Sequence, residues 1–255
     1  MPRRLRFEDG GYHHVYNRGV ARGDIFLDEY DKVKFIEILS SVCKEYKFNI
    51  HSFCLMDNHY HLLVENKKEN LSDGIRQLNS QYASYFNKRH SRVGHLWQGR
   101  YKSWYVMDEK YLFTLFRYIE SNPLKANMTK SIGEYKYCAT YSIKRDAMPP
   151  FLQNSFVLRD YHIEELFDML DIPLSPNELE NIDKFHKRRY KKEDGKILHV
   201  KKKSLEEHLL HVKDKKQRDE AIKYAFEDGY KKSEIGRTFS LSGAGVAKIL
   251  KKFRV

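Results

Sequence analysis

The chain has 255 residues, enough for one large domain or two of ordinary size. Its hydrophobic content of 41% supports a folded core, and no run of about 18 apolar residues exists, so no transmembrane helix is expected. The net charge of +12, with 18 tyrosines and 15 phenylalanines, suits a polyanionic partner whose bases stack on aromatic rings. The alternative is a basic surface that only keeps the protein dissolved, because net charge alone indicates solubility and non-specific association and identifies no specific partner.

The cysteines indicate a reducing compartment. Cys43, Cys54 and Cys138 are scattered and have no Cys-x-x-Cys spacing. We therefore expect neither a disulfide framework nor a thiolate zinc site, and the cytoplasm fits best. The basic residues 1–6 precede no apolar segment, so no signal peptide is predicted.

The first half of the chain alternates between strand and helix patterns. Residues 11–17 are aromatic and β-prone, and residues 28–47 carry apolar side chains at helical spacing. Residues 48–56 and 59–65 predict two antiparallel strands joined by a tight turn at Asp57-Asn58.

A second helix is predicted at residues 71–89, with Ser72 as its N-cap, and a loop and strand at residues 94–106. Asp108 is placed to cap a third helix over residues 109–121, which Pro123 should end at Asn122. The order β-α-β-β-α-β-α predicts an antiparallel sheet with helices packed on it, an α+β domain. Met148-Pro149-Pro150 breaks this pattern, so we assign residues 1–150 to the first domain.

The remaining chain has a different character. Residues 160–171 and 175–190 predict helices, and residues 184–203 hold ten Lys or Arg and only two acids. We interpret residues 151–205 as a basic helical linker region, either a solvated face or a segment that follows a phosphate backbone.

Residues 206–255 predict a small domain with a helix-turn-helix. Short helices at residues 233–239 and 243–251, the second capped by Ser242, meet at a tight turn. Such a pair can place its second helix in a DNA major groove, with Arg237, Lys248, Lys251 and Lys252 available to DNA. The alternative is a three-helix cap without DNA contacts.

The pair His59 and His61 is the first candidate for chemistry. Alternate side chains of a strand share a face, so the two imidazoles project together while Tyr60 points the other way. Neutral imidazoles are good ligands of divalent metals. Twelve histidines produce such a pair by chance fairly often, so the spacing is not specific by itself.

Tyr118 and Asn122 are four residues apart and share one helix face. An amide oxygen can complete a metal site, and a phenol one turn away can then attack a phosphorus atom and form a covalent phosphotyrosine. The simpler alternatives are a half-buried packing tyrosine and a helix-end asparagine before proline.

Four ordered blocks resemble the HUH single-tyrosine transposases, in particular the REP-associated tyrosine transposases. They are residues 12–19 (YHHVYNRG), 56–64 (MDNHYHLLV), 94–103 (GHLWQGRYKS) and 118–126 (YIESNPLKA). The resemblance covers roughly residues 8–145. Asp57 departs from the pattern, since relatives often have proline before the Asn-His, but a turn accepts either residue.

The resemblance implies a ferredoxin-like α+β fold for residues 1–150. It implies His59 and His61 as paired metal ligands, Tyr118 as nucleophile, Asn122 as third ligand, and Mg²⁺ or Mn²⁺ as the metal. By the same resemblance, the substrates of the protein would be single-stranded DNA ends with nearby hairpins. The protein would be a monomer or homodimer associated with a prokaryotic nucleoid. The released 3′-hydroxyl could reverse the attack, so strands would be rejoined without a nucleotide cofactor.

Further DNA contacts are expected from the core. Arg18, Arg100 and Lys102 are candidates for phosphate contacts, and Trp97 and Tyr101 for stacking on bases, with core packing as the equal alternative for the two rings. Two other functions stay open. A non-catalytic regulator would bind duplex DNA through the helix-turn-helix, and a phosphodiesterase would use water, although no carboxylate cluster supports it.

Overall fold

The computed structural model describes residue 7 and residues 9–108, 110–188, 190–200, 203–210 and 212–253. Residues Phe7–Lys187 form one compact unit, and the described part of Arg188–Val255 belongs to a second. The first unit therefore continues well beyond the predicted boundary at residue 150. The reason is that apolar side chains of the next segment pack into the same core, among them Phe151, Leu152, Phe156, Val157, Leu166, Leu170 and Phe185.

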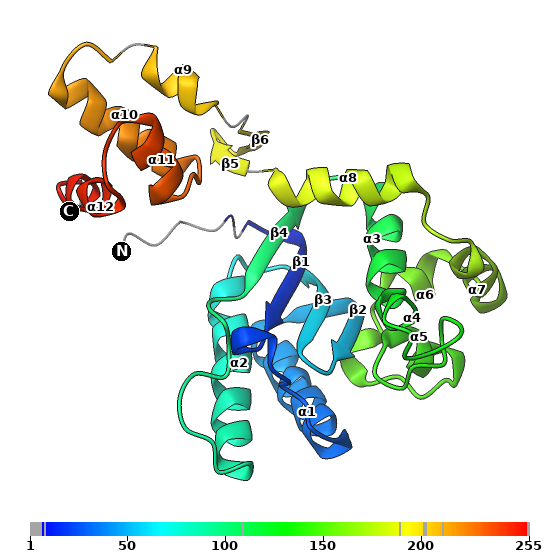
Figure 1. Cartoon of the computed structure of the whole chain (residues 1–255). Helices are drawn as coiled ribbons and strands as arrows, with labels where there is room; N and C mark the ends of the chain where they lie inside the picture. Colours follow the sequence, from blue (N-terminus) through cyan, green and yellow to red (C-terminus); the bar gives the residue numbers. More distant parts are fainter. Residues whose placement is uncertain are drawn as a thin grey trace. The chain divides into compact units, whose positions relative to one another are not determined.

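The first unit is built on a four-stranded antiparallel sheet (Figure 1). Its strands are β1 (Gly11–Arg18), β2 (Phe48–Met56), β3 (His59–Asn66) and β4 (Lys102–Val106), in the order β2-β3-β1-β4. Helices α1 (Glu29–Tyr46) and α2 (Leu71–Arg89) provide the two crossovers. A β-α-β-β-α-β chain with this strand order is the ferredoxin-like arrangement, so the predicted α+β fold is confirmed.

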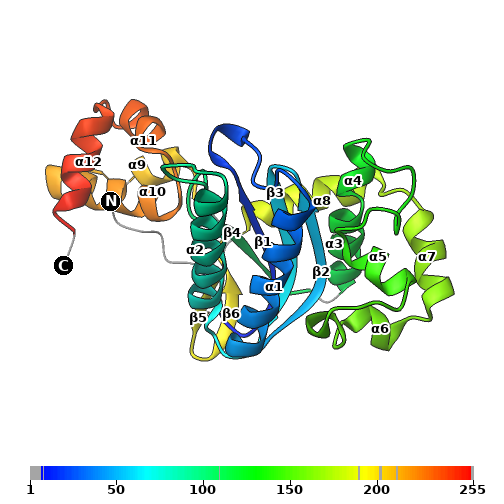
Figure 2. The same cartoon turned by 90° about the horizontal axis from the view of Figure 1, so that it is seen from below.

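Helices α1 and α2 lie side by side on one face of the sheet (Figure 2). Asp28 starts α1 by accepting a hydrogen bond from the backbone N–H of Asp31, and Lys47 ends it in the left-handed conformation. Tyr60 points to this face, because its ring lies 4.9 Å from that of Phe35 and its hydroxyl donates to Asn79 at 3.0 Å. Alternation along β3 then turns His59 and His61 to the opposite face.

The opposite face is covered by α3 (Lys110–Glu120) and α8 (Pro176–Lys187). Arg117 of α3 forms an ion pair of 2.7 Å with Glu178 of α8, and the rings of Tyr111 and Phe185 lie 4.7 Å apart. The segment between them holds short elements: α4 (Asn122–Lys125), α5 (Ala139–Lys144), η2 (Pro150–Leu152), α6 (Phe156–Asp160) and α7 (Ile163–Asp171). A further short turn, η1 (Val20–Arg22), follows β1.

Two local expectations are corrected. Helix α2 begins at Leu71 after Asn70, and Ser72 lies within it, with its hydroxyl 2.9 Å from the hydroxyl of Tyr101. Pro123 does not end the helical path. The backbone breaks at Ser121 and α4 follows, since proline is tolerated in the first turn of a helix, where its missing N–H has no partner to lose.

The second unit contains a hairpin that the sequence pattern did not predict. Strands β5 (Tyr190–Glu193) and β6 (Lys196–His199) pair across Asp194-Gly195, both with positive φ. Asp-Gly is a strong signal for a two-residue hairpin turn, and the surrounding run of lysines obscured it. Residues 151–205 are therefore not a purely helical linker.

The second unit ends in helices α9 (Leu205–Leu209), α10 (Lys215–Glu227), α11 (Lys232–Thr238) and α12 (Gly243–Lys251). They share a small core that includes Ile222, Ile235, Val246 and Leu250. Ser242 caps α12 as predicted, accepting a hydrogen bond of 3.0 Å from Gly245. Among the described residues, no helix has the length and apolar character that a membrane crossing requires.

A buried glutamate links the sheet to the back of α3. Glu120 is 2% exposed and accepts hydrogen bonds from the Ser52 hydroxyl at 2.5 Å and from the Thr140 hydroxyl at 2.6 Å. Burial raises the pKa of Glu120 to about 7, against the hydrogen bonds that lower it. Between pH 4.5 and 7 the unfolded chain thus releases a proton that the folded protein keeps, and stability falls as the pH rises through this window.

We expect Glu120→Gln to remove this pH dependence, because the amide stays neutral and can still pair with Ser52 and Thr140. From pH 5 to pH 8 the free energy of unfolding of the variant, relative to wild type, should rise by roughly 2 kcal/mol. Urea denaturation at the two pH values measures it, with exposed Glu164→Gln as control. Parallel pH profiles for wild type and Glu120→Gln would contradict the assignment.

Candidate active site

His59 and His61 share the sheet face under α3 and α8, as the strand alternation predicts. Their ring centroids are 5.1 Å apart. The register of β1 against β3 sets Tyr16 opposite His61 and Arg18 opposite His59. The Tyr16 ring consequently lies 4.9 Å from His61 and 5.5 Å from His59, and forms one side of the histidine pair.

In both histidines the Nδ1 atom has a partner. Nδ1 of His59 lies 2.6 Å from Oδ1 of Asn58, whose own amide nitrogen donates to the carbonyl of Arg22 at 3.1 Å. Nδ1 of His61 lies 2.8 Å from Nε2 of His14. Nε2 is therefore the nitrogen that each imidazole has left for a metal. An oriented Nδ1 partner is typical of histidine ligands.

Burial keeps these rings neutral. It lowers the pKa of His61 well below its usual value of 6.5, with the neighbouring imidazoles adding to the effect. Burial also lowers the pKa of His59 to about 4, and Arg18 contributes in the same direction. At neutral pH both rings are uncharged, which is the state that a metal ligand requires.

Tyr118 lies on α3 above the same face, half-buried. Its ring centroid is 6.1 Å from that of His61 and 6.2 Å from that of His14. Burial raises the pKa of Tyr118, and Asp183 and Tyr16 add to this rise. The phenol is therefore protonated at rest, so no pre-formed phenolate activates it.

Lys125 is a neighbour of Tyr118 that was not among the predicted residues. Its ammonium nitrogen lies 4.5 Å from the centroid of the Tyr118 ring, because α4 follows α3 directly. Desolvation lowers the pKa of Lys125. Lys125 lies in the sequence block at 118–126, seven positions after Tyr118. Because the helix breaks between the two residues, their spacing does not predict whether they share a face.

Asn122 is held beside Tyr118 by its own amide. Its Nδ2 donates to the carbonyls of Tyr118 at 2.9 Å and Ile119 at 3.1 Å. Because carbonyl oxygens only accept, the amide nitrogen must face α3, and Oδ1 is the atom left for a ligand.

The nitrogen and oxygen ligands at this site fit a divalent cation that accepts both kinds of donor. Two imidazole nitrogens and an amide oxygen suit Mn²⁺, whereas Mg²⁺ would rely more on water and phosphate oxygens. Across the described part of the chain, no group of three or more His, Cys, Asp or Glu side chains is arranged to hold a metal. Any cation here thus depends on Asn122 or on oxygens of a bound phosphate.

Two further histidines extend the site and were not among the predicted residues. His14 belongs to the first sequence block and faces His61 from β1. His186 comes from α8, and its Nε2 lies 3.0 Å from Nδ1 of His14. Alternation in β1 could have placed His14 on the face of Tyr16, but no sequence signal connects His186, 172 positions away, with this face.

The predicted DNA contacts of the core separate into two groups. Arg100 and Lys102 are exposed, and Arg18 is partly exposed and donates to Gln98. Tyr101 is 5% exposed and Trp97 donates its indole N–H to the carbonyl of Asn79 at 2.9 Å. Tyr101 thus follows the packing alternative, and Trp97 offers only part of its ring.

The predicted contacts of the second unit lie on its surface. Arg237 on α11 and Lys248 and Lys251 on α12 are exposed. Lys252 is exposed too, but its ammonium group pairs with Asp219 at 2.8 Å. These cations are available to a polyanion, and Lys252 would first have to leave its carboxylate.

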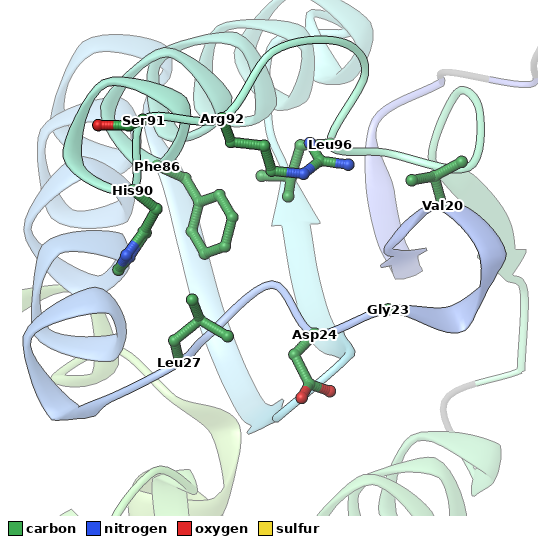
Figure 3. Close-up of a pocket in the computed structure, with 9 residues that line it drawn as sticks. All are labelled: Val20, Gly23, Asp24, Leu27, Phe86, His90, Ser91, Arg92 and Leu96. Atoms are coloured by element: carbon green, nitrogen blue, oxygen red, sulfur yellow. The ribbon is translucent and has the colours of Figure 1, made fainter.

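A pocket of about 490 Å³ lies between the turn after β1 and the end of α2 (Figure 3). Its wall includes Phe86, Leu27 and Leu96, with His90 and Arg92 at the polar side. Asn58 ties the turn that borders the pocket to His59, since it hydrogen-bonds both Arg22 and the imidazole.

Comparison with known proteins bears on the first unit. Residues 9–122 match the family described as "Transposase IS200 like". A Haemophilus influenzae protein named "Putative REP-associated tyrosine transposase" is 24% identical over 158 residues, which covers 57% of this chain and 89% of the relative. A solved REP-associated tyrosine transposase bound to a REP hairpin is 18% identical, with a TM-score of 0.46, over 58% of this chain and 88% of that one.

His59, His61, Tyr118 and Asn122 all lie within the matched segment. The resemblance to this group of transposases is thereby confirmed: residues 9–122 match the IS200-like transposase family.

Proposed function

We propose that the protein cleaves and rejoins single-stranded DNA through a 5′-phosphotyrosine on Tyr118, assisted by Mg²⁺ or Mn²⁺. One observation carries the proposal: a tyrosine ring lies 6.1 Å from a histidine whose Nδ1 is occupied and whose Nε2 is left for a ligand. His59 lies beside His61, and its Nδ1 is likewise occupied, by a hydrogen bond with Asn58. The match of this segment to transposases supports DNA as the substrate class.

The chemistry is a transesterification. The Tyr118 oxygen forms a bond to the scissile phosphorus, the bond from phosphorus to the 3′-oxygen breaks, and the leaving oxygen takes up a proton as the phenol loses one. Attack by the released 3′-hydroxyl reverses these steps. The number of phosphoester bonds is unchanged, so joining needs no external energy source.

His59, His61 and Asn122 would hold the cation. When bound, it would polarise the phosphate and neutralise part of its charge. Hydrogen bonds within the protein orient these three side chains. Asn58 and His14 fix the ring planes of His59 and His61, and the carbonyls of Tyr118 and Ile119 fix the amide of Asn122. Lys125, at 4.5 Å from the Tyr118 ring, supplies a positive charge where the phenol must become an anion.

The substrate is proposed to be a DNA end next to a hairpin, as the sequence resemblance implies. The exposed cations Arg100 and Lys102, with Arg18 close to His59 across the strand pair, support binding of a phosphate backbone near the histidines. A monomer or homodimer would serve, according to whether one or two DNA ends must be exchanged.

We expect Tyr118→Phe to abolish the covalent intermediate while DNA binding persists, because only the attacking oxygen is removed. A denaturing gel with labelled single-stranded DNA that contains the hairpin flanking the gene, with Mn²⁺ or Mg²⁺, measures the protein–DNA adduct. Tyr111→Phe on the same helix is the control. An adduct of unchanged yield in Tyr118→Phe would exclude the proposed nucleophile, and metal-dependent cleavage without any adduct in the wild type would point to water instead.

Lys125→Met should keep the fold and slow adduct formation by about 10²-fold, since removing one charge-stabilising group from a reacting centre commonly costs this much. Exposed Lys130→Met is the matched control. Single-turnover rates at saturating DNA separate chemistry from binding. If only the DNA affinity changes, Lys125 contacts the backbone and does not assist the phenol.

A second function has support from a different part of the chain. We propose that the second unit binds duplex DNA through α11 and α12, a pair of short helices joined by a tight turn at residues 239–242. Gly236 permits this turn, since a Cβ there would lie 2.4 Å from the carbonyl oxygen of Leu241. The exposed Arg237, Lys248 and Lys251 support binding to phosphates.

Replacing Lys248 and Lys251 by alanine should weaken duplex binding, and the slope of log affinity against log salt should fall by about one for each phosphate that the variant no longer neutralises. Fluorescence anisotropy at several salt concentrations measures both quantities. Lys223→Ala combined with Lys215→Ala, on α10, serves as the charge-matched control. An equal weakening in the control pair would mean that the unit attracts DNA by net charge alone.

A further inference from the structure

We propose that His14 and His186 are positioning residues that fix the tautomer of His61 and so direct its Nε2 towards the metal. This inference rests on the proposed function of the site. It assigns a role in that site to α8, a helix that lies outside the transposase match at residues 9–122.

The three rings form a chain of hydrogen bonds. Nδ1 of His61 lies 2.8 Å from Nε2 of His14, and Nδ1 of His14 lies 3.0 Å from Nε2 of His186. His14 is fully buried and His61 is 5% exposed, so water does not compete for these atoms. His14 uses opposite nitrogens for its two neighbours. The rings therefore cannot direct three nitrogens at one metal, and the arrangement is a relay of hydrogen bonds rather than a metal cluster.

Proton positions along such a chain are linked. Each neutral imidazole carries one N–H, and each hydrogen bond needs one donor and one acceptor. If His186 accepts at Nε2, His14 must donate from Nδ1 and accept at Nε2, and His61 must donate from Nδ1. Nε2 of His61 then has a free lone pair. With the opposite direction, Nε2 of His61 carries the proton and cannot bind a metal.

The surroundings of His186 keep its ring neutral. Burial lowers the pKa of His186 to about 4, and Lys102 acts in the same direction, whereas Asp183, three positions earlier on α8, opposes the shift. A neutral His186 carries one N–H, so its Nε2 can accept from Nδ1 of His14. The proposed direction of the chain is the one in which His186 accepts, since only this direction leaves a lone pair on Nε2 of His61.

The position of His186 is set by packing. Its ring stacks on Trp104 with centroids 4.0 Å apart, and the Trp104 indole N–H donates to the His186 carbonyl at 2.8 Å. The ion pair of Arg117 with Glu178 ties the other end of α8 to α3, which carries Tyr118. Contacts at the two ends of α8 therefore hold both His186 and the helix that carries Tyr118 in place.

Two substitutions separate hydrogen bonding from packing. His186→Gln keeps an acceptor near the position of Nε2, whereas His186→Phe keeps the stacked ring and removes the acceptor. Without it, the buried Nδ1–H of His14 has no partner, which favours reversal of the chain. Exposed His162→Gln, in the same unit, is the control.

The tests are performed on the full-length protein. Two-bond ¹H–¹⁵N correlation spectra identify the protonated nitrogen of His61 without metal, and electron paramagnetic resonance titration with Mn²⁺ measures affinity without DNA. We expect the Nδ1–H tautomer in wild type and His186→Gln, and Nε2–H in His186→Phe. Mn²⁺ affinity should fall about 10-fold in His186→Phe, the lower end of the usual effect of losing a partner of a ligand, and change little in His186→Gln.

Three outcomes overturn the inference: an Nε2–H tautomer of His61 in wild type, the same Mn²⁺ affinity in His186→Phe as in wild type, or an equal reduction of that affinity in His186→Gln. The failure of the proposed function has a different signature. Wild-type protein would then bind Mn²⁺ no better than His59→Ala, or form no adduct at Tyr118, whatever the spectra of His61 show.

Discussion

The antiparallel register of β1 and β3 is the constraint on which the site depends. It sets Tyr16 opposite His61 and Arg18 opposite His59, and it turns His14 to the same face as both histidines. A slip of β3 by one residue would move His59 and His61 to the face that α1 and α2 cover, away from His14, Tyr16 and Arg18. The buried alternate face, with Tyr60 against Phe35 and Asn79, holds the register, because a slipped pairing would turn Tyr60 away from both partners. Core packing on one side of the sheet thus determines which side chains meet on the other.

The second determinant is the low polarity of the covered face. Burial lowers the pKa values of His14, His59, His61 and His186, and raises that of Tyr118. All five groups are consequently neutral near pH 7, and the ammonium group of Lys125 lies against the phenol ring. In the proposed reaction the neutral imidazoles would bind the cation, and the phenol would give up its proton as the cation and a phosphate enter. The resting site holds no charged nucleophile of its own.

Much of the first unit was predictable. The strands at 48–56 and 59–65, the helices at 28–47 and 71–89, and the common face of His59 and His61 follow from local periodicity, which the structure confirms. Other features depended on longer range. The boundary at residue 150 was misplaced because a Pro-Pro break reveals nothing about where the following apolar side chains pack. The hairpin at 190–199 was hidden by its lysines, and Tyr101 was offered to DNA although its ring lies in the core.

By itself, the sequence determined the alternation that pairs His59 with His61 and the order of elements that produces a ferredoxin-like sheet. These follow from the periods of strand and helix, which involve only neighbouring residues. Tertiary structure alone decided that His14 and His186 join His61, that Lys125 lies over Tyr118, and that Asn58 holds His59. The physical reason is that these contacts join separate elements, so they exist only after the sheet register and the packing of α3 and α8 bring distant segments within hydrogen-bonding distance.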